Sequence, residues 1–188
     1  YAIGFPYSDH CGLVGWKCRP FRSKNFFGIG RTSKVDLFGW ARALRIDCDT
    51  LWIVEGEFDA IALDYCMTLA GDMGKYPVVS ATNGGGSLAK NITDMWESLD
   101  RYENIVLVLD DDEVGHKAEE AAVSLLESRA HIVNKPNNTK DANEAVERGF
   151  ALEMGQMALN FKLANKHTKI TEESNPKEVE ILDVDIDI

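Results

Sequence analysis

Two dense apolar runs that end in carboxylates most constrain how this chain can fold. Residues 105–109 are all aliphatic, and three aspartates at 110–112 follow directly. Residues 51–54 form a second such run, which ends at Glu55. Runs this apolar are typical of strands buried on both faces. Carboxylates crowded at the rim of a core repel one another, and a bound divalent cation relieves that repulsion. We therefore predict two adjacent acidic strand ends that hold magnesium.

The middle of the chain alternates between short apolar runs and amphipathic segments. The expected strands are 51–54, 76–80, 105–109 and 130–134, and the expected helices are 58–69, 87–99, 115–126 and 141–148. In the first helix Ile61, Tyr65 and Leu69 recur every four residues, so we expect them to face the core. Repeated strand–helix units predict an α/β fold with a parallel sheet and helices on both faces. Ligands of such sheets bind at the carboxyl ends of the strands, where the acids fall.

The first part of the chain has a different character. Residues 2–7 and 13–19 read as strands joined by a turn at 8–12, and Lys17 and Arg19 alternate, so they share one face. Residues 1–49 carry eight Lys and Arg against four Asp, a net charge of +4 that leaves -15 for the remainder. This asymmetry suits a local basic surface beside a carboxylate–metal centre.

Three units follow from these patterns. We expect a basic, strand-rich subdomain at 1–48, the α/β domain at 49–150, and a helical extension with an acidic tail at 151–188. A helix is expected at 151–164. Residues 178–188 alternate acids with Val, Ile and Leu, which fits an edge strand, a partner-binding tail or a frayed terminus. Because the chain starts at Tyr1 rather than Met, we expect a fragment or a processed chain.

Composition excludes several classes of protein. No apolar run approaches the ~20 residues of a membrane span, and no signal peptide opens the chain. The four cysteines form no Cys-x-x-Cys pair, so we expect reduced thiols and a cytoplasmic location. His10 and Cys11 with Cys18 would make half a metal site, although ordinary thiols are the favoured interpretation.

The spacing of the acids indicates a division of roles. Asp110 and Asp112 project to one side of an extended chain, and Asp111 to the other. Asp59 lies four residues beyond Glu55, on a helix face that turns back towards it. Carboxylates at two adjacent strand ends suit Mg²⁺, or Mn²⁺, and phosphoryl transfer. The glycines at 84–86 open a helix, so their N–H groups either meet a phosphate or form a plain turn.

These acidic motifs carry a resemblance to a known family. Residues 54–59 and 109–115 resemble the Glu and Asp-x-Asp motifs of the Toprim domain. The chain also resembles the primase half of the primase-helicases of short-tailed bacteriophages, and the related mitochondrial helicase Twinkle. Five further segments carry that resemblance: 17–19, 24–26, 37–39, 76–80 and 140–144.

The resemblance implies roles for individual residues. Glu55 would be the catalytic carboxylate and a metal ligand, and Asp110 and Asp112 would hold magnesium. Asp141 would be a further ligand, with Asp59 supporting Glu55 or the metal. The residues implied to bind triphosphate or DNA are Lys17, Arg19, Lys24, Gly84, Gly85 and Lys140, of which Lys17 and Arg19 would also assist catalysis.

The resemblance implies an RNA-polymerase core of a DNA primase. Its expected partners are single-stranded DNA, ribonucleoside triphosphates and a replicative ring helicase, and no membrane. The chain holds neither the Gly-x-x-x-x-Gly-Lys-Ser/Thr motif of a helicase engine nor a four-cysteine zinc ribbon. Alternatives that use the same acids are a Toprim nuclease and a small phosphotransferase. A non-catalytic, helicase-associated Toprim module is a third, although retention of the acids argues against it.

Overall fold

The parallel sheet predicted from the apolar runs is present. A computed structural model describes residues 1–161 of the chain. Its larger sheet is four-stranded, all parallel, with the order β5-β4-β6-β7. The strands are β4 (Thr50–Val54), β5 (Val78–Ser80), β6 (Asn104–Val108) and β7 (Ala130–Ile132). This arrangement confirms the α/β fold that the repeated strand–helix pattern predicts.

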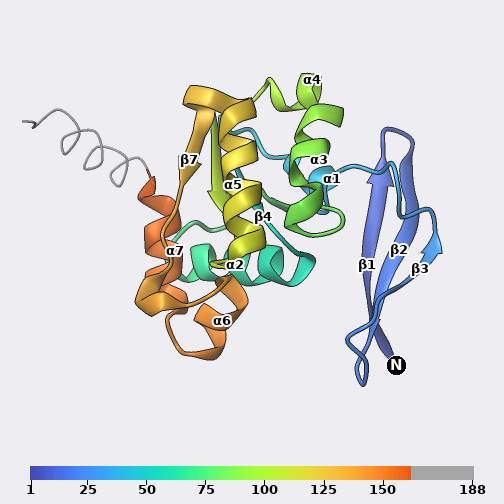
Figure 1. The fold of residues 1–188 in the computed structure, drawn as a ribbon, viewed down its shortest axis with the longest axis horizontal. Coiled ribbons are helices and arrows are strands. Elements are labelled where there is room, and N and C mark those ends of the chain that lie inside the picture. The colour runs from blue at the N-terminus through green and yellow to red at the C-terminus, as the bar shows by residue number, and fades with distance from the viewer. Residues whose placement is uncertain (162–188) are drawn as a thin grey trace, which may run out of the picture.

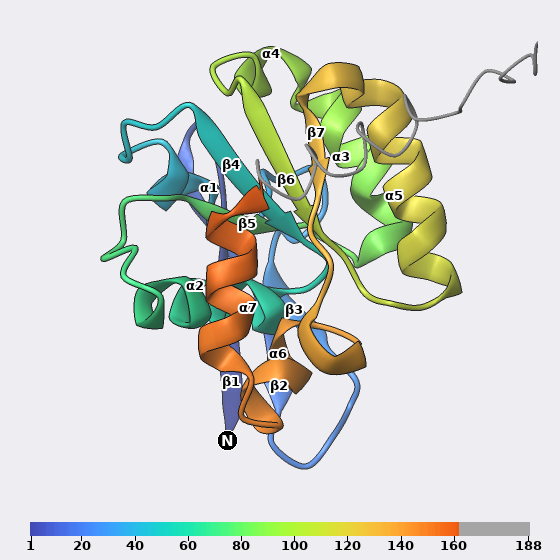
Figure 2. The ribbon, with the colours of Figure 1, turned by 90° about the vertical axis from the view of Figure 1, so that its left-hand side faces the viewer.

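Helices cover both faces of this sheet, as expected (Figures 1 and 2). One face carries α1 (Trp40–Ala43), α3 (Leu88–Asp94), α4 (Trp96–Leu99) and α5 (Glu113–Leu126). The other carries α2 (Glu57–Leu69), α6 (Ala142–Glu147) and α7 (Ala151–Leu159). Single 3-10 turns lie at Gly85–Ser87, Glu127–Arg129 and Pro136–Asn138. Because side chains alternate along a strand, Leu51 and Ile53 enter the first core, and Trp52 and Val54 the second.

The basic N-terminal part is a separate antiparallel sheet beside the parallel one (Figure 1). Its strands are β1 (Ala2–Asp9), β2 (Gly12–Pro20) and β3 (Phe27–Gly30), in that order. The sequence did not predict β3, because all four of its residues are exposed and two are glycines. Phe5 joins the two parts, since its buried ring packs edge-on against Phe38 and Phe58 at centroid distances of 5.7 and 5.0 Å.

The expected core face of α2 is wrong. Ile61, Tyr65 and Leu69 are 53%, 51% and 47% exposed. A second set of residues on the same helix is buried instead: Ala60, Ala62, Leu63, Cys66 and Met67. This face of α2 is buried in part because α7 packs closely against it. The approach is so close that a Cβ added to Gly155 of α7 would lie 2.0 Å from the Cys66 carbonyl oxygen. Both faces of α2 carry apolar residues, and the packing of α2 against α7, α6 and the sheet decides which face is buried.

Other differences are local. The helix expected at 87–99 is interrupted at Met95, which separates α3 from α4. Of the helix expected at 151–164, residues beyond 161 and the acidic tail lie outside the described part of the chain. Within residues 1–161, no helix is both long and apolar enough to cross a membrane.

Candidate active site

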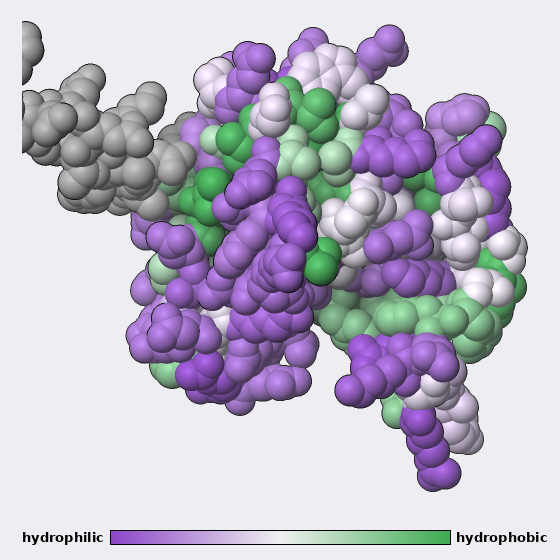
Figure 3. Space-filling model, viewed as in Figure 1, coloured by the Kyte–Doolittle hydropathy of each residue, from purple (hydrophilic) through white to green (hydrophobic). Residues whose placement is uncertain are grey.

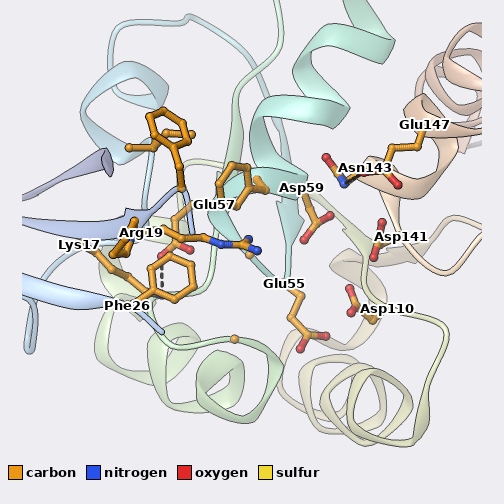
Figure 4. A pocket seen from close by; sticks show the side chains of 16 residues that line it. Lys17, Arg19, Phe26, Glu55, Glu57, Asp59, Asp110, Asp141, Asn143 and Glu147 are labelled. Carbon is orange, nitrogen blue, oxygen red and sulfur yellow. Dashed lines mark hydrogen bonds and ion pairs between the residues drawn. The ribbon is translucent and has the colours of Figure 1, made fainter. Parts of the chain in front are cut away.

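The two acidic strand ends meet at one edge of the parallel sheet. β4 and β6 pair in parallel with Val54 opposite Val108, so Glu55 and Asp110 both lie just beyond this edge. An open cleft of about 700 Å³ separates them from the N-terminal sheet. Glu55, Asp59, Asp110 and Asp141 line one wall of this cleft (Figure 4). The sequence-predicted carboxylates therefore converge from the ends of β4 and β6 and the starts of α2 and α6.

The three aspartates after β6 divide as their spacing indicates. Lys140 Nζ lies 2.9 Å from an Asp110 carboxylate oxygen and 3.0 Å from one of Asp112. Asp111 instead faces His116, with 2.8 Å between its carboxylate and Nε2. Asp112 also caps α5, since it accepts hydrogen bonds from the N–H groups of Val114 and Gly115 at 3.0 Å. Asp110 and Asp112 thus carry two negative charges on one side of the loop, which the single Lys140 ammonium balances only in part.

Glu55 is held by the glycine loop after β5. Its carboxylate accepts a hydrogen bond from the Gly85 backbone, and a Cβ on Gly85 would lie 2.9 Å from Glu55 Cδ. Burial raises the pKa of Glu55, and the charges of Asp110 and Asp112 raise it further. Its Oε2 atom is buried and has no hydrogen-bond partner among the described residues. The glycine loop at 84–86 was expected either to meet a phosphate or to form a plain turn. In the structure it lies against the Glu55 carboxylate and positions it.

Asp59 is the most perturbed acid of the cleft. Burial, followed by repulsion from Asp141 and Asp110, raises its pKa from the ordinary 3.8 to about 7. Burial also raises the pKa of Asp110, although Lys140 opposes the shift. Asp141 caps α6 by accepting a hydrogen bond of 2.6 Å from the Glu144 N–H. Burial, and then repulsion between the carboxylates, raises the pKa values of Glu55 and Asp59, and a bound cation would relieve that repulsion.

A pH dependence of stability follows from Asp59. Its folded pKa lies above its unfolded value, so the native state binds the extra proton and loses stability as the pH rises from about 4 to 7. In metal-free buffer, Asp59→Asn is expected to remove this loss and to raise the free energy of unfolding at pH 8 by on the order of 3 kcal/mol. Urea unfolding at pH 5 and pH 8 measures it. The exposed, ion-paired Asp94→Asn is the control; an unchanged pH slope in Asp59→Asn would contradict the account.

The opposite wall of the cleft comes from β2 and is basic (Figure 4). Lys17 and Arg19 share one face, as predicted. Lys17 Nζ lies 2.7 Å from Glu57 Oε1 and donates to the Thr82 carbonyl at 3.2 Å. The Arg19 guanidinium lies over the rings of Phe58 and Phe26, at 5.0 and 5.8 Å from their centroids. Within residues 1–161, Lys17 is ion-paired and Arg19 is not, so Arg19 is the more available cation of the two.

Glu57 is the functional residue that sequence reasoning missed. It is 3% exposed, and it accepts hydrogen bonds from the Tyr7 hydroxyl and the Lys17 ammonium. Burial, and then the hydrogen bond to Glu57, raises the pKa of Tyr7. The sequence feature that could have pointed to Glu57 is its position in the Glu-Gly-Glu motif. Phe26, Asn143 and Glu147 also line the cleft without having been predicted.

Two expected binding residues lie elsewhere or are already engaged. Lys24 is exposed in the loop between β2 and β3 and does not line the cleft. Lys140 is held by Asp110 and Asp112. Gly84 does line the cleft.

His10, Cys11 and Cys18, the less favoured half metal site of the sequence analysis, do not form a close group of three ligands. Cys18 is buried, and Asp9 joins His10 and Cys11 instead, with ligand atoms of the three within 4.8 Å of one another. Among residues 1–161, this is the one group of three potential ligands packed so closely. Asp9 of this group is also ion-paired with Arg31. Among the described residues, no three carboxylates of the cleft therefore have ligand atoms that all lie within 4.8 Å of one another.

The cleft residues fit a hard divalent cation. The donor set is entirely carboxylate, which is the chemistry that Mg²⁺ and Mn²⁺ prefer. The partnerless, buried Glu55 Oε2 and the raised pKa values of Glu55 and Asp110 indicate unbalanced negative charge. The Lys140 ammonium already sits between Asp110 and Asp112, which shows that a cation is accommodated there.

Comparisons with known proteins agree with this geometry. Residues 52–146 match the family described as Toprim-like. The chain is 35% identical over 140 residues to a DNA helicase/primase of Enterobacteria phage T3, covering 73% of this chain and 23% of that protein. The chain thus spans about a quarter of that relative.

Solved structures give the same assignment. The primase fragment of the bacteriophage T7 primase-helicase is 31% identical, with a TM-score of 0.69 over 82% of this chain and 60% of that one. A T7 primase domain, in an assembly with lagging-strand DNA polymerase and an RNA/DNA hybrid, is 34% identical, with a TM-score of 0.70 over 84% and 76% of the two chains. The resemblance inferred from the acidic motifs is confirmed, and the chain belongs to the Toprim-like family, with the fold of the phage T7 primase.

Proposed function

We propose that this chain is the RNA-polymerase core of a phage DNA primase, which joins ribonucleotides on single-stranded DNA. The observation that carries the proposal is the cleft itself. Carboxylates at two parallel strand ends face Lys17 and Arg19 across it, in a chain whose relatives are phage primase-helicases. Phosphoryl transfer needs these two parts, an acidic metal centre and a cation for the triphosphate.

Each wall has its own task in the proposal. Asp110, Asp112 and Glu55 would hold Mg²⁺ or Mn²⁺. Asp59 and Asp141 would be supporting acids. Lys140 would move away from Asp110 and Asp112 when the metal binds. The metal supplies charge neutralisation at the reacting phosphate. Glu55 would accept the proton of the attacking 3′-hydroxyl, because a raised pKa makes a carboxylate a better base near neutral pH. Arg19 would bind the triphosphate, supported by Lys17.

Domain limits and partners complete the proposal. Residues 1–48 would form the basic wall, 49–150 the Toprim domain, and 151–188 an extension towards a ring helicase. The T3 relative is a helicase/primase, and the T7 assembly contains two primase domains with an RNA/DNA hybrid. By analogy, single-stranded DNA, ribonucleoside triphosphates and a replicative helicase are proposed for this chain, in the cytoplasm of an infected bacterium.

The proposal is tested by primer extension. A short RNA annealed to a DNA template removes any need for template selection by another module. With labelled ribonucleotides and Mg²⁺, template-directed extension is expected. Nicking of a supercoiled plasmid without extension would establish the nuclease alternative. Neither activity, at Mg²⁺ or Mn²⁺ concentrations that saturate the cleft, would establish a non-catalytic module and overturn the proposal.

Gly85→Ala is expected to lower RNA synthesis by about 10- to 100-fold, because a Cβ there displaces the Glu55 carboxylate. Steady-state extension rates measure the effect. The matched control is the neighbouring Gly86→Ala, whose Cβ would have no atom within 4 Å. Equal rates in the two variants would show that the loop does not position Glu55.

A further inference from the structure

The N-terminal sheet has a second face, directed away from the Toprim part, on which several large side chains are exposed. Phe5, Tyr7 and Lys17 point towards the Toprim part, and their strand neighbours therefore point away from it. On the outer face Trp16 stands opposite Pro6 on one side and Ile29 on the other, and Phe27 stands next along β3. Trp16, Phe27 and Ile29 are 39%, 46% and 56% exposed. We call these three residues the outer stripe.

Hydrophobic side chains gather visibly over this sheet. In Figure 3 a pale green area lies over the N-terminal sheet at the right of the view, bordered by hydrophilic residues. Gly4 helps to place the indole, because a Cβ there would lie 3.2 Å from Trp16 Cε3. The Trp16 ring therefore lies against bare backbone. An exposed apolar stripe of this kind marks an interaction site rather than a core.

The charge around the outer stripe identifies the kind of partner. Residues 10–35 hold six Lys and Arg and no Asp or Glu. Lys17 and Arg19 face the cleft and Arg31 is paired with Asp9, which leaves Arg22, Lys24 and Lys34. Arg22 and Lys24 are exposed in the loop that joins β2 to β3, whose first residue, Phe21, lines the cleft. Asp9, at the far end of β1, is neutralised by Arg31. The partner is therefore anionic and carries flat apolar groups.

Single-stranded nucleic acid meets both requirements. Its bases stack on exposed aromatic rings, and its phosphates pair with flanking Lys and Arg. Two copies of this chain that met through the stripe would bring two basic loops together, and like charges disfavour that contact. A double helix keeps its bases stacked inside, so it offers no base faces to Trp16 or Phe27.

We infer that the outer stripe and the basic β2–β3 loop bind single-stranded DNA, with bases stacked on Trp16 and Phe27 and phosphates paired with Arg22 and Lys24. This surface is distinct from the catalytic cleft. That the ligand is DNA rests on the proposed function, in which this surface would guide the template strand past the cleft. Lys24, which does not line the cleft, gains a role here.

The test is binding of the whole chain to a fluorescein-labelled oligothymidylate of about 12 nucleotides, followed by anisotropy without nucleotides or metal. Trp16→Leu is expected to weaken binding by about 10-fold or more, and Phe27→Leu to do likewise. Trp96→Leu is the matched control, because Trp96 is 43% exposed on α4 in the other part of the chain. Arg22→Gln and Lys24→Gln are each expected to reduce the salt dependence of binding.

Four outcomes decide the inference. Equal affinities of Trp16→Leu, Phe27→Leu and Trp96→Leu would overturn it, and so would equally tight binding of duplex and single strand. A concentration-dependent dimer that Trp16→Leu abolishes would assign the stripe to self-association instead. If binding depends on the stripe but the wild-type chain extends no primer, the proposed function fails and the binding surface stands. Both aromatic residues are exposed, and circular dichroism with thermal unfolding checks that each variant folds.

Discussion

Glu55→Gln is expected to abolish almost all ribonucleotide incorporation, by a factor of at least about 100. Glutamine keeps the size of the side chain and its hydrogen bond from the Gly85 backbone. It removes the proposed base and one metal ligand. The fold is expected to survive, because burial and two neighbouring aspartates already disfavour the ionised form of Glu55. Single-turnover extension of an annealed RNA, measured across pH, reports the loss.

The control for this variant is Glu113→Gln, whose side chain is 83% exposed and paired with Lys117 at the start of α5. It is expected to extend primers at the wild-type rate. A Glu55→Gln protein that kept wild-type activity and an unchanged pH profile would remove Glu55 from the chemistry. Reduced activity with a lowered unfolding temperature would instead indicate a structural role.

Lys17→Met is expected to lower the free energy of unfolding by about 3 kcal/mol, because it leaves the buried Glu57 carboxylate without its counter-ion. The loss arises between the two parts of the chain, since Lys17 lies on β2 and Glu57 begins α2. The Tyr7 hydroxyl alone cannot balance the charge. Guanidinium unfolding, followed by circular dichroism, measures the change.

A double variant separates pairing from packing. Lys17→Met combined with Glu57→Leu is expected to recover most of the lost stability, because no buried charge then remains. Lys24→Met, in the exposed loop between β2 and β3, is the control and is expected to change stability by less than about 0.5 kcal/mol. A Lys17→Met protein as stable as Lys24→Met would show that Glu57 is not a buried, charged partner of Lys17.

The sequence predicted the parts of the site that local pattern determines. A strand that is buried on both faces appears in the sequence as an uninterrupted apolar run. The ends of β4 and β6, and the acids that follow them, were therefore predictable. Alternation along β2 placed Lys17 and Arg19 on one face, and the Asp-x-Asp spacing separated Asp111 from its neighbours. Each of these follows from the geometry of a single strand.

The remaining features depend on contacts between distant segments. Glu57 is buried because β1 and β2 fold over it, and nothing within Glu-Gly-Glu distinguishes a buried acid from an exposed one. Lys140 lies between Asp110 and Asp112 only because the segment before α6 returns to the end of β6. On α2, both faces carry apolar residues, and packing against α7, α6 and the sheet decides which face is buried. Such choices are made by tertiary packing and leave no periodic signal.

Formation of the first phosphodiester bonds on an annealed RNA, compared between Asp110→Asn and Asp111→Asn, tests the central claim most directly. The two acids are adjacent in sequence, yet only Asp110 lines the cleft. The account predicts that Asp111→Asn extends the RNA at the wild-type rate and that Asp110→Asn is slower by at least about 100-fold at saturating Mg²⁺. Equal rates in the two variants would contradict a nucleotidyl-transfer site built on the ends of β4 and β6.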